Sequence, residues 1–113
     1  LAVDCLDNLS TRRILFSESR TRGIPVVSGA IGGFCGQIGV AMPDEQNLAE
    51  FLSGDTDKGV EPETGHPPFT PAVIAALECA QAVKILTGKG KLLTDKLLWM
   101  DLAEDEFMRL RLS

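Results

Sequence analysis

The stretch that decides the fold is residues 1–13, LAVDCLDNLSTRR. It opens with a short apolar run typical of a buried strand, and the carboxylates Asp4 and Asp7 follow, with Asn8 beside the second. In an open parallel sheet, ligands bind outside the carboxyl ends of the strands, and the N–H groups of the following helix suit phosphate. Two interpretations remain open for Asp7 and Asn8. They form a ligand site, with Asp7 holding a metal or accepting protons, or they only cap the next helix.

A helix and a second strand are predicted directly after this turn. The helix covers residues 8–22, is capped by Asn8 or Ser10 and ends at Gly23. Residues 26–28 (VVS) then form a short buried strand. A strand, a helix and a strand with tight links make a βαβ unit, so the two strands should be parallel.

A glycine-rich segment follows the second strand. Five glycines fall between Gly29 and Gly39, but the segment matches neither the Walker A pattern nor the dinucleotide fingerprint. We expect a bend and then a third strand over residues 36–42, with glycines that allow close backbone approach.

The middle of the chain has a weaker pattern. Residues 43–69 are predicted to be a loop or crossover region with a short helix at 44–52. Residues 53–64 (SGDTDKGVEPET) are polar and acidic, which predicts an exposed, mobile loop. His66 is the only histidine, and no cysteine lies near it, so we interpret it as a loop residue.

The clearest helix is predicted at residues 70–87, with Thr70 as its cap and Gly88 at its end. Apolar side chains cover most of its circumference, and the residues that remain form a narrow polar stripe of Glu78, Gln81 and Lys84. Such a helix should be buried against a sheet and against a second surface as well.

The chain closes with KLLWMDL (residues 96–102) and EFMRLRL (residues 106–112), which predict an antiparallel hairpin. Together the elements predict an α/β fold, a partial Rossmann-like (doubly wound) mixed sheet that ends in this hairpin.

Composition limits the possible functions. The 113 residues are enough for one domain, and a net charge of −5 with a pI near 4.8 argues against a nucleic-acid partner. We expect no apolar run to be long enough to span a membrane, so no membrane partner is predicted. Three cysteines without a CxxC motif indicate free thiols, a reducing cytoplasm and no structural zinc.

Several blocks resemble the ThiF/MoeB/HesA family, which is related to ubiquitin-activating enzymes. They are DCLDN with the following Thr11-Arg12, GIPVVSG at residues 23–29, AVKILTGKG at residues 82–90, and LLWMD at residues 97–101. Their order and spacing match the C-terminal half of the family's adenylating domain, over residues 1–113 apart from the region around 43–69.

The resemblance implies a reaction. Family members bind ATP and magnesium and adenylate the C-terminal carboxylate of a ubiquitin-like or sulfur-carrier protein. By position in the motif, Asp7 is implied to be the catalytic, magnesium-linked aspartate, which makes sense because Mg²⁺ neutralises the nucleotide and fixes its geometry. Asn8 and Arg12 are implied as further nucleotide-binding residues, although Arg12 could instead be structural.

The chain also departs from the family. The family's glycine-rich nucleotide loop, arginines and catalytic lysine precede this motif, and the chain, which starts at Leu1 inside a strand, looks like a piece of a longer protein. We therefore expect the isolated chain to bind no cofactor and to be inactive. We also expect a homodimer, because the helix at residues 70–88 and the severed edge of the sheet should leave apolar surface exposed. Two alternatives stay open: a non-enzymatic module for dimerisation or for docking a ubiquitin-like protein, and the distal half of another doubly wound nucleotide-binding protein.

Overall fold

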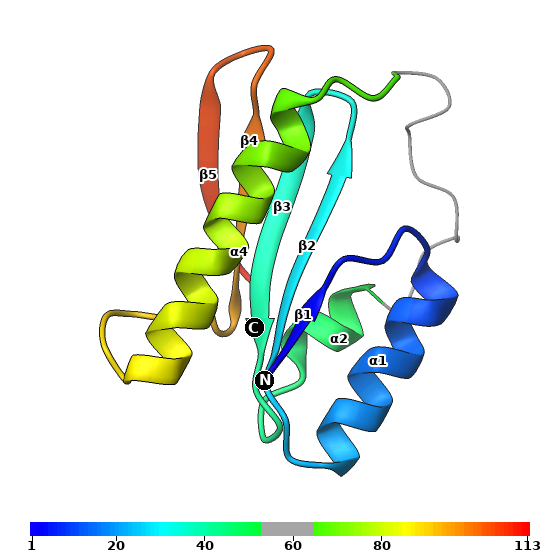
Figure 1. Ribbon diagram of the computed structural model, residues 1–113, viewed down its shortest axis with the longest axis vertical. Coiled ribbons are helices and arrows are strands. Elements are labelled where there is room, and N and C mark those ends of the chain that lie inside the picture. The colour runs from blue at the N-terminus through cyan, green and yellow to red at the C-terminus, as the bar shows by residue number, and fades with distance from the viewer. Residues whose placement is uncertain (53–64) are drawn as a thin grey trace.

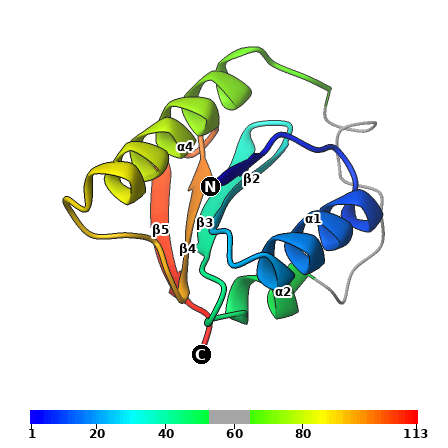
Figure 2. The ribbon, with the colours of Figure 1, turned by 60° about the horizontal axis from the view of Figure 1, so that its bottom comes forward.

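A computed structural model describes residues 1–52 and 65–113, and in these residues five strands form one mixed sheet with helices on both faces (Figure 1). The strands lie in sequence order: β1 (Ala2–Asp4), β2 (Val26–Gly32), β3 (Cys35–Ala41), β4 (Lys96–Asp101) and β5 (Glu106–Arg111). Helix α4 (Phe69–Thr87) covers one face, while α1 (Leu9–Thr21) and α2 (Asn47–Leu52) lie on the other (Figure 2). The exposed loop predicted at residues 53–64 falls outside the described residues.

The predicted βαβ unit is confirmed. β1 and β2 are parallel, with Ala2 paired to Val26 and Asp4 paired to Ser28. The side chain of Asn8 caps α1 by accepting a hydrogen bond from the Thr11 N–H at 2.8 Å. An Asn cap satisfies one of the N–H groups that the first helical turn leaves unpaired.

The core is divided between the two faces of the sheet because successive strand residues point to opposite sides. Val26 contributes to a cluster on the α1 and α2 side together with Phe16 and Leu48. Val27 belongs to a second cluster, which Leu77 and Ile85 of α4 cover. Each such side chain contributes roughly 1.5–3 kcal/mol when fully buried. The same alternation directs Ser28 toward α1 and the Cα of Gly29 toward α4.

The predicted bend and third strand are present, but the second strand is longer than the predicted residues 26–28 and the bend comes later. β2 continues to Gly32 and pairs along its whole length with β3, so residues 26–41 form an antiparallel hairpin. Gly33, at φ +59°, makes the turn between them, inside the glycine-rich segment where the bend was expected. The predicted use of glycine for close approach is confirmed, since a Cβ at Gly29 would lie 2.6 Å from Ile74 Cγ2 and one at Gly36 would lie 2.8 Å from Ile74 Cγ1.

Helix α4 differs from its prediction at its start. It begins at Phe69, and no side chain caps it, so the predicted capping role of Thr70 is wrong. Thr70 is buried and its hydroxyl donates to the carbonyl of Gly33 at 2.7 Å. The Phe69 ring meets Phe34 edge-on with centroids 5.1 Å apart. Contacts with the β2–β3 turn thus fix the start of the helix in place of a local cap.

The polar stripe of α4 faces mainly inward. Glu78 and Gln81 are buried, whereas Val83 and Leu86 are exposed. Gln81 Oε1 accepts a hydrogen bond from the Leu93 N–H at 3.0 Å, which satisfies one buried polar group. The glycines of β2 and β3 explain this orientation, because they leave room for the side chains of α4 that lie nearest the sheet.

By length and apolar composition alone, α4 could cross a membrane, which corrects the expectation that no segment was long enough. The criterion is weak, because core helices also meet it. Here α4 packs lengthwise on β2 and β3 (Figure 1).

The remaining elements agree in type with the sequence. Helix α2 begins at Asn47, three residues later than predicted, and Glu45 Oε1 accepts the Asn47 N–H at 2.6 Å. β4 and β5 form the predicted antiparallel hairpin, with Lys96 paired to Arg111. His66 lies exposed in an irregular segment, as predicted. The predicted α/β fold with a mixed sheet and a C-terminal hairpin is therefore confirmed.

Candidate active site at the end of β1

The buried carboxylate of Asp4 anchors the end of β1. Asp4 is fully buried, and its Oδ2 accepts hydrogen bonds at 2.6 Å from both Arg12 Nε and Ser28 Oγ. Its Oδ1 accepts the N–H of Leu6 at 2.9 Å. A buried charge is tolerated when it is paired and its lone pairs are used. Asp4 meets both conditions, and its bond to Leu6 begins the turn that carries Asp7.

Arg12 braces the same turn from the first helix. Its Nη2 donates to the Leu6 carbonyl at 2.6 Å and, with a longer bond of 3.4 Å, to the Gly29 carbonyl. Arg12 is also buried, so in this structure its guanidinium is occupied by the chain itself. Asp4 and Arg12 thus hold both backbone groups of Leu6, one residue before Asp7.

Asp7 and Asn8 lie side by side on the outside of this turn. Asp7 is exposed, and its Oδ1 accepts a hydrogen bond from Asn8 Nδ2 at 3.0 Å. Asn8 Oδ1 is used for the helix cap and also accepts from the Ser10 hydroxyl at 3.0 Å. The capping interpretation is therefore confirmed for Asn8. Asp7 is presented to solvent beside the helix start, and its role in a ligand site stays a prediction.

A second buried carboxyl group lies near by, on the opposite face of the sheet. Glu78 of α4 is only 6% exposed, and among the described residues its Oε2 is the buried side-chain oxygen without a hydrogen-bond partner. Its carboxyl carbon lies 2.9 Å from where a Cβ on Gly29 would be. Burial, and after it the nearby negative charge of Asp4, raise the pKa of Glu78 to about 7 against the lowering effect of Arg12.

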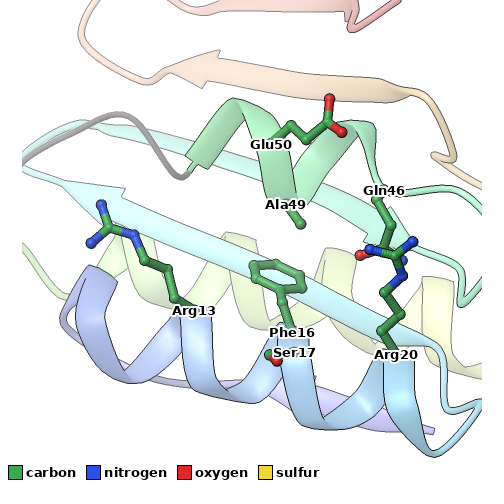
Figure 3. A pocket seen from close by; sticks show the side chains of 7 residues that line it. All are labelled: Arg13, Phe16, Ser17, Arg20, Gln46, Ala49 and Glu50. Atoms are coloured by element: carbon green, nitrogen blue, oxygen red, sulfur yellow. The ribbon is translucent and has the colours of Figure 1, made fainter.

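A shallow pocket of about 270 Å³ lies away from this turn, between α1 and α2 (Figure 3). Phe16 points into it from α1, with Arg13 and Arg20 of the same helix on either side. Gln46, Ala49 and Glu50 line the other wall. None of the predicted site residues lines this pocket.

The structure brings together two of the three predicted site residues and gives the third a different environment. Asp7 and Asn8 are adjacent and accessible, and Arg12 lies beneath them, bonded to Asp4. The sequence analysis did not single out Asp4, Ser28 or Glu78 as parts of this cluster. Glu78 carried a usable signal, because it lies one helical turn after Ile74 and thus on the same face of α4.

Magnesium is the metal that this turn would suit. No group of three or more His, Cys, Asp or Glu side chains that could hold a metal occurs in the described part of the chain. Mg²⁺, however, is commonly bound by one or two carboxylates together with substrate phosphates. An exposed Asp7 beside the start of a helix fits that limited role, and Asn8 keeps its carboxylate in place.

These observations define a class: an α/β protein that presents a carboxylate and a helix start at the carboxyl end of a parallel strand. The whole chain, residues 1–113, matches the ThiF family and belongs to it.

The chain is also similar to three curated proteins. It is 31% identical to the SAMP-activating enzyme E1 of Haloferax volcanii over 95% of this chain and 41% of the relative. It is 34% identical to the sulfur carrier protein adenylyltransferase of Thermus thermophilus over 97% of this chain and 44% of that protein. It is 29% identical to the molybdopterin-synthase adenylyltransferase of Escherichia coli, over 99% and 46%. The chain thus spans less than half the length of each of these relatives.

Solved structures support the fold. Escherichia coli MccB with ATP superposes with a TM-score of 0.72 at 13% identity, over 98% of this chain and 36% of MccB. PaaA superposes with a TM-score of 0.63 at 15% identity, over 91% of this chain and 33% of PaaA. At these identities the likeness concerns the fold alone, and it is consistent with a Rossmann-like architecture.

Proposed function

We propose that this chain is part of an ATP-dependent adenylyltransferase that activates the C-terminal carboxylate of a ubiquitin-like or sulfur-carrier protein as an acyl-adenylate. The observation that carries the proposal is the braced turn after β1, in a chain that matches the ThiF family over its whole length. Support comes from the names of the three relatives: a SAMP-activating enzyme E1, a sulfur carrier protein adenylyltransferase and a molybdopterin-synthase adenylyltransferase.

In this proposal Asp7 is the catalytic residue that meets the magnesium-bound nucleotide. Magnesium, when bound with ATP, would neutralise the phosphates and favour attack by the carrier carboxylate on the α-phosphorus. Asn8 keeps the Asp7 carboxylate turned outward through its 3.0 Å hydrogen bond, and the helix start adds a favourable field for phosphate. Arg12 contributes by holding the turn, because its guanidinium is occupied by Asp4 and Leu6.

ATP binding needs more than one exposed carboxylate. The described residues present Asp7 at the turn, and Mg²⁺ releases its water reluctantly. We therefore propose that the 113 residues alone bind ATP weakly and catalyse no adenylation. A protein that also supplies a phosphate-binding loop should bind ATP and catalyse adenylation.

The proposal includes a homodimer in a reducing cytoplasm. Free Cys5, Cys35 and Cys79 suit such a compartment. Exposed apolar side chains on α4, among them Val83 and Leu86, offer a surface for a second subunit. The alternative function, a non-enzymatic module for dimerisation or docking, uses the same surface and needs no role for Asp7.

Exchange of pyrophosphate into ATP tests the proposed reaction. In the complete protein supplied with its carrier protein, Asp7→Ala should lower the exchange rate by orders of magnitude, because the magnesium-linked carboxylate is lost. Asp7 is exposed, so thermal unfolding should change little.

A matched control is Asp44→Ala, which removes another exposed carboxylate, remote in sequence from the turn. It should leave the exchange rate unchanged. Equal exchange in wild type and Asp7→Ala would remove Asp7 from the mechanism, and no exchange with any carrier protein would favour the docking module.

A further inference from the structure

Gly29 is the point where the two sides of the candidate site meet. Its carbonyl accepts the 3.4 Å bond from Arg12 Nη2, which comes from α1. From the opposite face, the carboxyl group of Glu78 lies against the Gly29 Cα, so closely that a Cβ there would be 3.0 Å from Glu78 Oε1. One residue without a side chain therefore separates Glu78 from the Asp4–Arg12 pair.

The groups around Glu78 leave its charge uncompensated. The Arg12 guanidinium already pairs with Asp4 at 2.6 Å, and Glu78 Oε2 has no hydrogen-bond partner although it is buried. The charged groups that act on Glu78 are Asp4 at the end of β1 and Arg12 on α1. The Cys5 thiol of the turn also lies near enough to feel the charge of Glu78, and Gly29 of β2 lies against the Glu78 carboxyl group.

We propose that Glu78 is a positioning residue for the turn that carries Asp7. When Glu78 is uncharged, Arg12 continues to brace the turn. When Glu78 is ionised, it competes for Arg12 and the turn loosens. The inference rests on the proposed function, in that Asp7 is the group positioned. When Glu78 is neutral, Arg12 balances Asp4 and holds the Leu6 carbonyl. When Glu78 is ionised, two buried carboxylates share one guanidinium, and the Leu6 carbonyl is the ligand that Arg12 can release.

Glu78 changes its ionisation state within the physiological pH range. Because burial and Asp4 raise the pKa of Glu78 to about 7, the carboxyl group is mostly neutral one pH unit below this value and mostly ionised one unit above it. The turn should therefore be better ordered at mildly acidic pH than at mildly basic pH.

The test compares Glu78→Gln with wild type in the complete protein at a series of pH values. Gln imitates the neutral carboxyl group, so the ratio of variant to wild-type kcat should rise from about one near pH 6 to several-fold near pH 8. KM for the carrier protein should stay unchanged, because loosening of the turn does not alter the surface that the carrier protein contacts. Taking the ratio cancels the intrinsic pH dependence of the chemistry.

A second readout does not depend on activity. Hydrogen exchange of the Leu6 amide, which is bonded to Asp4, should become faster in wild type than in Glu78→Gln above pH 7. Glu78→Met, which also removes the charge, should behave like Glu78→Gln, whereas Glu104→Gln in the exposed turn between β4 and β5 should behave like wild type.

The two proposals fail in different ways. Ratios of kcat and of Leu6 exchange that stay constant with pH would overturn the role of Glu78. If neither protein shows adenylation but the Leu6 exchange responds as expected, the proposed function fails and the coupling between Glu78 and the turn stands.

Discussion

At the scale of single residues, one buried ion pair determines where the candidate catalytic aspartate lies. Asp4 and Arg12 are both buried and joined at 2.6 Å, and between them they hold the N–H and carbonyl of Leu6. A buried ion pair adds little to the free energy of unfolding compared with a well-packed apolar pair. Removing one member, however, leaves the other charged and unpaired. The pair therefore fixes the geometry of the turn more than it adds to stability.

Replacing Arg12 should lower the free energy of unfolding. Arg12→Met leaves the Asp4 carboxylate buried without its partner, so we expect a loss of about 3–5 kcal/mol in the free energy of unfolding, measured by urea denaturation. The control is Arg22→Met, which breaks an exposed pair with Glu18 at 3.6 Å and should cost less than about 1 kcal/mol. Similar losses in both variants would contradict the structural role given to Arg12.

The pKa of Glu78 also predicts a pH dependence of stability. Its folded pKa of about 7 lies above the ordinary value of 4.5, so the folded state binds the proton more tightly than the unfolded state. This stabilising effect is fully present below pH 4.5 and is lost as the pH rises through about 7. The loss amounts to roughly 3 kcal/mol at most.

Glu78→Gln removes this titration. The unfolding free energy of the variant, relative to wild type, should therefore increase between pH 4.5 and 7 and level off above that range. Urea titrations at five or six pH values would measure it. A constant difference over the whole range would show that Glu78 titrates normally.

At the scale of elements, the packing of α4 depends on glycines in the strands beneath it. Ile74 fills the space that side chains at Gly29 and Gly36 would occupy. This close approach turns Glu78 and Gln81 toward the sheet, and the large apolar residues Val83 and Leu86 face outward. An apolar helix is thus oriented by the room in its neighbour as well as by its own pattern.

Gly29→Ala should separate α4 from the sheet. The new Cβ would lie 2.6 Å from Ile74 Cγ2 and 2.9 Å from the Glu78 carboxyl carbon, so the helix must move. Overpacking of this kind costs typically about 1–3 kcal/mol, which thermal unfolding would detect. Ala75→Ser, an exposed change on α4, should stay within about 0.5 kcal/mol of wild type. An unchanged melting temperature in Gly29→Ala would contradict the close packing.

At the scale of the whole molecule, apolar surface is concentrated on α4 and β5. On α4, Val83 is 57% and Leu86 73% exposed, and on β5, Phe107 is 58% exposed. Large exposed apolar side chains that gather on a surface mark an interaction site when they form a patch. We predict self-association through the α4 side.

A charge on that surface should weaken association. Val83→Glu should shift the protein toward monomer in sedimentation analysis without lowering its melting temperature, because the residue already faces solvent. Ile14→Glu places the same charge on an exposed residue of α1, on the other face of the sheet, and should leave association unchanged. A wild-type protein that stays monomeric at high concentration would disprove the prediction.

Local sequence signals determined most of the elements. The apolar run before Asp4, the cap at Asn8 and the glycine at residue 23 were enough for the βαβ unit, because caps and turns depend on neighbouring residues. Alternating residues were enough for the hairpin at residues 96–111. The motif around Asp7 also indicated the family to which the chain belongs.

Only the tertiary structure decided how these elements meet. Three features each depend on contacts between different elements: the pairing of Arg12 with Asp4, the close approach of Glu78 to Gly29, and the start of α4 at Phe69. Whether a polar side chain on an apolar helix faces water or the core depends on the space left by the backbone opposite. That space belongs to another element, so the pattern of the helix itself cannot specify it.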